Sequence, residues 1–329
     1  MSPIVIEILL FILGLLCLVK GGDWFVDGAT GIAHKFKMPE ILIGATVVSI
    51  GTTIPEVMVS STAALTSGAS DMAYGNAIGS VICNTALIAA ITMTFRPAPI
   101  EKKSLRQPII FFFIAAIFYS GVAYTTGYFS RIVGIILLCT FVVYMVLCVK
   151  QVKLSKDSSE EKEDTSSDNE KVSPMWKDIL FLVLGAAVIA VGADLLVDNG
   201  TLLAEAAGVP QTVIALTFVA LGTSLPELVT AVTALIKGHS DLSLGNVIGA
   251  NLFNLVLVTG MATTLSPFKV PSAKTIAGMN ASLVVDIPVM FAVMLIMCLP
   301  SLIKGKLYRA QGIALLVIYF SYIAFQFIA

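Results

Sequence analysis

Two short motifs combine a carboxylate with proline, glycine and hydroxyl residues. Residues 51–56 read GTTIPE and residues 222–227 read GTSLPE, and each motif lies in the middle of an apolar segment. Proline has no N–H and clashes in a helix with the carbonyl four residues earlier. Each proline should therefore free a carbonyl oxygen, that of Gly51 or Gly222. Carbonyls, hydroxyls and carboxylates are the ligands that hard cations prefer, so the motifs predict a cation site at interrupted helices.

The carboxylates of these motifs are Glu56 and Glu227. A charged side chain in the middle of a membrane helix costs at least about 2.5 kcal/mol on insertion scales and by default indicates a functional site. Two carboxylates offset the charge of one Ca²⁺, and several Na⁺ can occupy the same oxygen cage. Competition of the two ions for shared ligands is a basis for exchange. The structural alternative is a pair of protonated or hydrogen-bonded core glutamates.

A second motif, G-N-x-I-G, occupies residues 75–79 and 245–249 and opens the next apolar segment in each case. Its small residues favour close helix packing in a membrane. Polar side chains follow within the same segments, namely Ser80, Asn84, Asn251 and Asn254. Hydrogen bonding to neighbouring helices is one interpretation of these side chains. Their recurrence in both copies favours a ligand role for Asn84 and Asn254.

Both motifs recur because the chain repeats itself. The sequence GATVVSIGTTIPEVMVSS, from Gly44, aligns with ALTFVALGTSLPELVTA, from Ala215, at an offset of 171 residues. The G-N-x-I-G blocks align at an offset of 170. Each half contains five apolar segments, and since five is odd, the second half must enter the membrane from the opposite side. Inverted repeats are typical of secondary transporters, with the site where the repeats meet.

The elements that position these motifs must be membrane helices. The chain is 57% hydrophobic and 12% charged, against about 25% charged in soluble domains. Its ten apolar segments span residues 4–31, 41–66, 74–95, 108–126, 131–149, 176–206, 211–236, 243–265, 275–299 and 307–328. In lipid only helices pair all the backbone groups of such segments. We therefore expect an all-α integral membrane protein with ten transmembrane helices in two inverted five-helix repeats, and with helices 2 and 7 broken at the motifs.

One polar stretch, residues 150–174, divides the chain. It is rich in Ser, Glu, Asp and Lys and lacks apolar periodicity, which predicts a disordered cytoplasmic linker. The expected domains are a first five-helix repeat over residues 1–149 and a second over residues 175–329. We interpret the acidic residues of the linker as solvated rather than as a region that gathers calcium.

The distribution of basic residues predicts the orientation of the chain. If the N-terminus lies outside, the cytoplasmic loops hold Lys35, Lys37, Arg96, Lys102, Lys103, Arg106, Lys237, Lys304, Lys306 and Arg309, and the linker adds further lysines. The external loops then keep only Arg131, Lys269 and Lys274. We expect both termini outside.

Other classes of function fit the sequence less well. A net charge of −1 argues against a nucleic-acid partner, and the five cysteines have neither disulfide nor metal-clip spacing. Paired glutamates could serve acid–base catalysis in an intramembrane peptidase, but no histidine lies in a predicted helix core. A passive channel would also bind cations without coupling two ions. We expect no enzyme activity, no cofactor and no obligate protein partner beyond the lipid bilayer.

At these motifs the sequence resembles the cation/calcium exchanger superfamily, especially prokaryotic sodium/calcium exchangers. The likeness covers nearly the whole chain, including the ten-segment plan and the polar central loop, and the paired G-T-[ST]-[IL]-P-E and G-N-x-I-G motifs make it specific. It implies a plasma-membrane antiporter that exchanges Ca²⁺ for Na⁺ by alternating access. A proton-coupled exchanger is the nearest alternative, and an exchanger for another divalent metal fits the all-oxygen ligand set less well.

The resemblance also assigns roles by position. Glu56 and Glu227 correspond to the central carboxylate ligands, with Asn84 beside them. The backbone carbonyls of Thr52 and Thr223 would ligate calcium. The sodium sites would take hydroxyls from Thr53, Ser224 and Ser80, with the backbone carbonyls of Ser49 and Ala220 beside them.

The chain departs from the family pattern at two positions. Ala250 stands where relatives usually have serine, which removes one sodium ligand or replaces it by backbone or water. Asn254 stands where many prokaryotic relatives and the potassium-dependent branch have aspartate. This change argues against potassium dependence and removes one candidate acid for a proton-coupled cycle. Asp286, in the ninth segment, has two interpretations, a structural hydrogen-bond partner or part of a second aqueous path.

Overall fold

The computed structural model describes residues 3–65, 70–97, 102–160, 174–208, 222–272 and 275–328. Within these ranges, eight helical spans are long and apolar enough to cross a membrane. The seventh and tenth predicted segments are represented by α11 (Leu225–Lys237) and α15 (Arg309–Ile328). The predicted all-helical membrane fold is confirmed.

The first half of the chain contains α1 (Pro3–Lys35), α2 (Glu40–Ile43), η1 (Gly44–Val48), α3 (Ser49–Leu65), α4 (Ser70–Cys83), η2 (Asn84–Ala89), α5 (Ala90–Phe95), α6 (Lys102–Thr125) and α7 (Arg131–Glu160). The second half contains α8 (Met175–Ala206), α11, α12 (Ser240–Phe253), η4 (Asn254–Val258), α13 (Thr259–Leu265), η5 (Ser282–Asp286), α14 (Ile287–Lys304) and α15. The η elements are π-helical turns inside longer helices.

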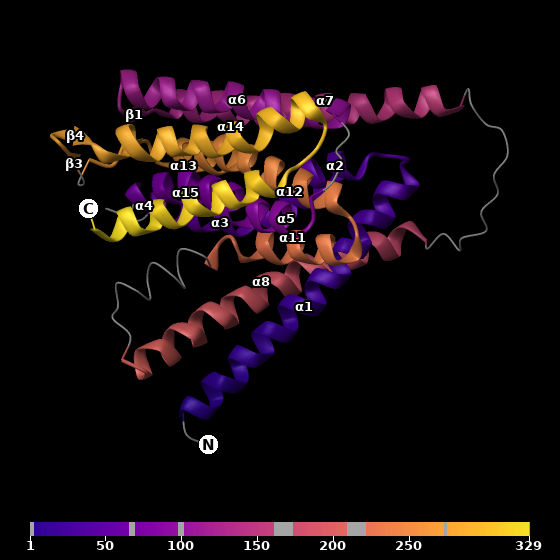
Figure 1. The fold of residues 1–329 in the computed structure, drawn as a ribbon, viewed down its shortest axis with the longest axis horizontal. Coiled ribbons are helices and arrows are strands. Elements are labelled where there is room, and N and C mark those ends of the chain that lie inside the picture. The colour runs from indigo at the N-terminus through magenta and orange to yellow at the C-terminus, as the bar shows by residue number, and fades with distance from the viewer. Residues whose placement is uncertain are drawn as a thin grey trace.

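The helices fall into two groups. Most of them run side by side along the long axis of the molecule, whereas α1 and α8 form a pair that crosses one flank obliquely (Figure 1). The starting end of α1 and the final end of α15 lie on the same side of the molecule (Figure 1). An even number of crossings requires this placement of the two ends.

Glycines bring α1 and α8 into close contact. A Cβ atom added to Gly14 would lie 2.9 Å from the carbonyl oxygen of Gly192, and one added to Gly185 would lie 2.8 Å from that of Gly21. Small residues allow membrane helices to approach this closely. Gly14 and Gly185 are equivalent in the repeat, as are Gly21 and Gly192. The repeat therefore maps one contact onto the other, as it must if a two-fold axis runs between the two helices.

Ion pairs hold the α1–α8 pair at one end. Lys35 of α1 bonds to Asp178 of α8, and both side chains are almost fully buried. Lys237, at the end of α11, lies 2.7 Å from a carboxylate oxygen of Asp27 and 3.4 Å from one of Asp23, both on α1. These contacts tie the pair to the seventh segment.

Two segment boundaries differ from expectation. The linker was expected to be disordered from residue 150, but α7 continues through Glu160. The extension contains Lys, Gln, Leu and Glu, which propagate a helix readily once an apolar segment has formed it. Residues 161–173 lie outside the described residues, and the division into domains stays a prediction.

The ninth helix begins at Ser282 rather than near residue 275. Strands β3 (Thr275–Ile276) and β4 (Met279–Asn280) pair in a hairpin there. Ala277 and Gly278 both have positive φ in its turn, as a two-residue hairpin of the primed type requires. A second short pair, β1 (Tyr128–Phe129) with β2 (Phe268–Lys269), joins the two halves of the chain.

We predict that Gly185→Ala destabilises the protein by about 1–3 kcal/mol, because its methyl group would lie 2.5 Å from the backbone nitrogen of Phe25. Thermal unfolding of the purified protein in detergent measures the effect. Gly121→Ala on α6 is the matched control, since that position is exposed and its Cβ meets no atom within 4 Å. Equal melting temperatures for the two variants would contradict the close packing of α1 on α8.

Candidate cation site

The two glutamate motifs are held by differently shaped helices. Pro226 lies in the first turn of α11, where its missing N–H is no loss, and the chain turns at Thr223 and Ser224 just before it. Glu227 thereby lies at a helix N-terminus, which favours negative charge. In the first repeat, α3 runs through Pro55 without a break, and the irregular turn is η1, which ends just before Ser49. The two motifs are thus related in sequence but not identical in conformation.

Six of the predicted ligands carry fully buried side-chain atoms that have no hydrogen-bond partner among the described residues. These residues are Glu56, Glu227, Thr53, Ser224, Asn84 and Asn254, and each side chain belongs to a residue at most 2% exposed. Buried polar groups are nearly always paired, and leaving one unpaired costs about 1–3 kcal/mol, more if it is charged. Other buried hydroxyls, such as those of Tyr74 and Thr263, are also unpaired, but within the described part of the chain only in the two motifs do unpaired oxygens accompany two buried carboxylates, which a cation would satisfy.

The fold brings these residues together from both repeats. Helix α3, which carries Glu56, packs against η4, and α11, which carries Glu227, packs against η2. Asn84 is the first residue of η2 and Asn254 the first of η4. Each glutamate helix therefore meets the π-turn of the opposite repeat, and the two carboxyl groups lie near enough to interact electrostatically. Single π-turns inside α-helices frequently mark functional sites.

The remaining predicted ligands lie around this cluster. Ser80 is buried on α4, one turn before Asn84. The hydroxyls of Thr52 and Thr223 already donate hydrogen bonds, to Asn246 at 3.2 Å and to Asn76 at 3.3 Å. These hydroxyls are engaged with protein, so the expected calcium ligands of the two threonines remain their backbone carbonyls.

Ser49 and Ala220 complete the expected set of ligands. Ser49 is fully buried, its hydroxyl donates to the carbonyl of Gly44 at 2.7 Å, and its carbonyl faces the hydroxyl of Thr52 at 3.4 Å. Ala220 lies outside the described residues. Ala250, where the family pattern has serine, is fully buried on α12 and has no side-chain ligand to offer.

Sequence reasoning missed Asn76 and Asn246, the second residue of each G-N-x-I-G block. Both contact a threonine of the opposite glutamate motif. The signal was present, because an asparagine recurs at the same position of two apolar segments. The packing interpretation of these blocks rests on their small residues and leaves the asparagines without a role.

Asp286 has protein partners. Tyr322 and Gln326 of α15 each donate a hydrogen bond of 3.0 Å to the same carboxylate oxygen. These contacts fit the interpretation of Asp286 as a structural hydrogen-bond partner. Among the described residues no group of three or more His, Cys, Asp or Glu side chains could hold a metal ion. The candidate site is therefore a pair of carboxylates surrounded by neutral oxygens.

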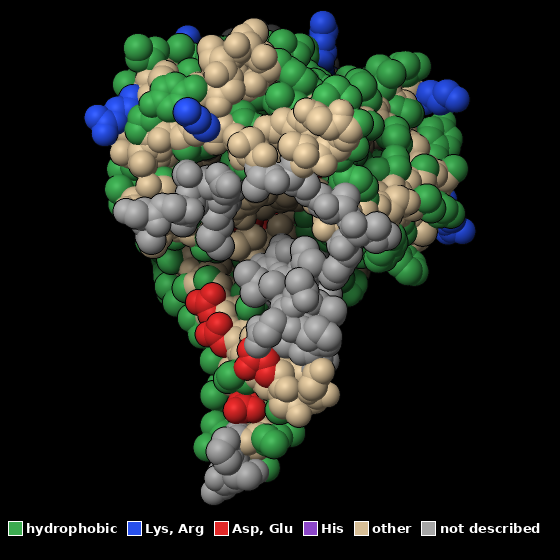
Figure 2. Space-filling model, turned by 90° about the vertical axis from the view of Figure 1, so that its left-hand side faces the viewer, with side chains coloured by type: hydrophobic (Ala, Val, Ile, Leu, Met, Phe, Trp, Pro, Cys, Tyr) green, Lys and Arg blue, Asp and Glu red, His purple; other side chains and the backbone are tan. Residues whose placement is uncertain are grey.

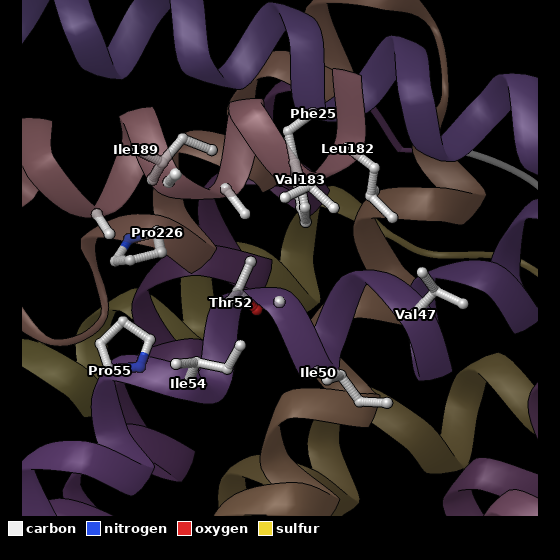
Figure 3. A pocket seen from close by; sticks show the side chains of 14 residues that line it. Phe25, Val47, Ile50, Thr52, Ile54, Pro55, Leu182, Val183, Ile189 and Pro226 are labelled. Carbon is white, nitrogen blue, oxygen red and sulfur yellow. The ribbon is translucent and has the colours of Figure 1, made fainter. Parts of the chain in front are cut away.

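An apolar pocket of about 460 Å³ separates the α1–α8 pair from the motif helices. Phe25 and Val183 line it from one side, and Thr52 and Pro55 from the other (Figure 3). Pro226 lies near Pro55 at one end of the pocket (Figure 3). The helix pair therefore meets the cation-site helices across a surface with few polar contacts.

Acidic side chains follow the outer part of the α1–α8 pair. Asp194, Asp198 and Glu205 are exposed on α8, and a row of acidic side chains runs along the tapering part of the molecule seen from that end (Figure 2). Such a row makes the potential on this side negative and raises the local concentration of cations.

Known proteins resemble this chain in sequence and in fold. A family model described as "Sodium/calcium exchanger protein" matches residues 6–150 and 177–328. The sodium/calcium exchanger MaX1 of Methanosarcina acetivorans is 31% identical over 98% of this chain and 99% of its own. The inner membrane protein YrbG of Escherichia coli is 37% identical over 78% of this chain and 79% of its own.

Solved structures extend the comparison to the fold. The sodium-calcium exchanger NCX_Mj, soaked with Na⁺ and Sr²⁺, superimposes with a TM-score of 0.81 at 30% identity, covering 98% of this chain and 99% of that one. Another structure of NCX_Mj, soaked with Na⁺ and Ca²⁺, has a TM-score of 0.80. The resemblance expected from the paired motifs is confirmed. The chain belongs to the sodium/calcium exchanger family and is a multi-pass membrane cation exchanger.

Proposed function

We propose that this cation exchanger is an antiporter that moves Ca²⁺ against Na⁺ at a site centred on Glu56 and Glu227. The observation that carries the proposal is the cluster of buried, orphaned oxygens contributed by both repeats. Two carboxylates balance one divalent ion, and the surrounding amide, hydroxyl and carbonyl oxygens complete the shell of six to eight ligands that Ca²⁺ takes.

Sodium would bind to the same set of ligands. Two Na⁺, each bound by one carboxylate and by the hydroxyl of Thr53 or Ser224, can replace one Ca²⁺ without leaving a buried negative charge. Simultaneous occupancy by both ions would place excess positive charge among shared ligands, so binding of one ion displaces the other. The names of MaX1 and NCX_Mj support sodium as the coupling ion, whereas that of YrbG specifies no ion.

Alternating access would use the two helix groups. The α1–α8 pair is held together by glycine contacts and a buried ion pair, and it faces the motif helices across the apolar pocket. Ion pairs of Lys237 with Asp23 and Asp27 tie α1 to the end of α11, so a shift of the pair over the apolar pocket would have to keep or break them. Movement of one helix group against the other is typical of transporters built from inverted repeats. The roles of Thr52, Thr223, Ser80, Ser49, Asn84, Asn254 and Ala220 given above are part of this proposal.

We further propose that the protein resides in a prokaryotic plasma membrane with both termini outside. The relative YrbG is named an inner membrane protein. The chain ends lie on one side of the molecule (Figure 1), and the basic residues of the loops favour the opposite side as cytoplasmic.

Calcium uptake into proteoliposomes loaded with sodium tests the coupling. An outward sodium gradient should drive ⁴⁵Ca²⁺ uptake in the parent protein, and both Glu56→Gln and Glu227→Gln should abolish it, because either change leaves the site with one charge. Glu7→Gln, on α1 away from the motifs, should transport normally.

The same assay separates the alternatives. Calcium uptake that does not depend on the sodium gradient but depends on a pH gradient would show proton coupling in place of sodium coupling. Two buried carboxyl groups also support proton coupling. Undiminished uptake in both glutamine variants would show that the site has been placed wrongly.

Binding can be measured apart from transport by thermal unfolding of the detergent-solubilised protein. At 100 times its Kd, Ca²⁺ should stabilise the parent by about 2.7 kcal/mol. We expect Na⁺ at high concentration to reduce this calcium-dependent shift, because the two ions compete. Glu56→Gln should lose the shift altogether, while Glu7→Gln keeps it. A calcium shift that is indifferent to Na⁺ would contradict shared ligands.

A further inference from the structure

The second asparagine pair, Asn76 and Asn246, contacts the glutamate motifs across the repeat boundary. Asn76 belongs to the first repeat and Asn246 to the second, and the two are equivalent at an offset of 170 residues. We propose that these asparagines are positioning residues that hold each glutamate motif to the opposite repeat and thereby set the affinity of the cation site. The inference rests on the function proposed above and adds residues to which the family resemblance assigned no role.

Asn76, on α4, connects three residues of the two motif helices. Its amide nitrogen donates to the hydroxyl of Ser60 at 2.8 Å and to the backbone carbonyl of Glu56 at 3.4 Å. Its amide oxygen accepts a hydrogen bond from the hydroxyl of Thr223 at 3.3 Å. One side chain thus bonds to the central glutamate of the first repeat and to the motif threonine of the second.

Asn246, on α12, makes the reciprocal contact. Its amide oxygen accepts from the hydroxyl of Thr52 at 3.2 Å and lies 3.4 Å from that of Ser49, whose hydroxyl also donates to the Asn246 carbonyl at 2.9 Å. Thr52 and Thr223 are equivalent in the repeat. The same bond thus forms in both copies of the repeat, with the partners exchanged between the two halves.

The two contacts differ in one respect that the sequence explains. The amide nitrogen of Asn246 is buried and has no hydrogen-bond partner among the described residues. Its counterpart in Asn76 donates to Ser60, and the residue equivalent to Ser60 is Ala231, which has no hydroxyl. Both Ser60 and Ala231 are fully buried. The amide nitrogen of Asn76 thus donates two hydrogen bonds, whereas that of Asn246 donates none among the described residues.

The positions of these bonds indicate what they do. Thr52 and Thr223 follow the glycines of the two motifs, Gly51 and Gly222, and their carbonyls are the proposed calcium ligands. A side-chain bond from each threonine to a helix of the other repeat restricts the orientation of the adjacent peptide groups. Ligands held in place before binding lose less entropy when the ion arrives, and buried hydrogen bonds are strong enough to hold them.

Calcium-dependent exchange in proteoliposomes tests the proposal. Asn76→Ala should raise the KM for Ca²⁺ about fivefold to tenfold, the size expected for the loss of one or two net hydrogen bonds, with a smaller change in maximal rate. Thr223→Val should raise it similarly, and Thr223→Ser, which keeps the hydroxyl, should leave it near the parent value. If Asn76 acts through Thr223, the double variant should show much less than the product of the two single effects.

A second pair of variants separates positioning from folding. Ser60→Ala should weaken calcium binding by removing a bond to Asn76, whereas Ala231→Ser should strengthen it or leave it unchanged by supplying the missing partner of Asn246. The calcium-dependent rise in melting temperature should follow the same order. A merely structural role would lower the melting temperature of Asn76→Ala without calcium while preserving the calcium-dependent rise.

Several results would overturn the inference. An unchanged KM in Asn76→Ala, or single effects of Asn76→Ala and Thr223→Val that multiply independently, would show that the asparagine does not act through the threonine. Equal calcium affinity in Thr223→Val and Thr223→Ser would show that the hydroxyl is irrelevant. The parent protein and Glu56→Gln are measured in parallel. If the parent exchanges calcium and Glu56→Gln does not, the proposed function stands even when this inference fails.

Discussion

The constraint on which the rest of the structure depends is the burial of two carboxylates in a bundle of apolar helices. Glu56 and Glu227 are completely inaccessible, and no hydrogen bond of normal length and angle reaches their carboxylate oxygens from the described residues, although the Thr52 hydroxyl lies next to Glu227. An arrangement of this kind is unfavourable unless a cation supplies the missing interactions or a proton neutralises the carboxylate. The neutral oxygens of Thr53, Ser224 and Asn84 are what a cation of high coordination number needs in addition to charge. A cation at the proposed site would use both kinds of group.

The inverted repeat explains how one chain builds such a site. Each repeat supplies a glutamate helix and a π-turn, and the glutamate helix of one repeat packs against the π-turn of the other. Reciprocal contacts recur between α1 and α8, where Gly14 meets Gly192 and Gly185 meets Gly21. They recur again at the motifs, where Thr52 bonds to Asn246 and Thr223 to Asn76. A two-fold arrangement places like groups around one axis, and it allows a site near the axis to be reached from either side of the membrane.

Much of the fold could be predicted from the sequence. The long apolar segments, the offset of 171 residues and the odd number of segments per half sufficed for the helical membrane architecture, because lipid permits few alternatives. Pro55 shows the limit of local reasoning. It was expected to open its helix, but α3 continues through it and the irregularity lies earlier, in η1. Tertiary packing tolerates proline inside a membrane helix when neighbouring groups satisfy the freed carbonyl.

The candidate site shows a similar division. Residues with intrinsic chemistry, such as Glu56 and Asn84, stand out because they are polar in an apolar segment. Asn76 and Asn246 also recur as polar residues, but their partners lie across the repeat boundary, and no local spacing identifies those partners. The extension of α7 to Glu160 was missed for a related reason, since its charged residues form a helix only as a continuation of an apolar one.

The central claim is that one divalent cation binds between Glu56 and Glu227, and diffraction from crystals soaked with Sr²⁺ as a calcium substitute tests it most directly. The account predicts an anomalous peak between the two carboxylates, with oxygen ligands from both repeats at about 2.3–2.6 Å or slightly longer for the larger ion, and no such peak in Glu56→Gln crystals soaked identically. A strong peak elsewhere in the protein, with none between the glutamates, would contradict it.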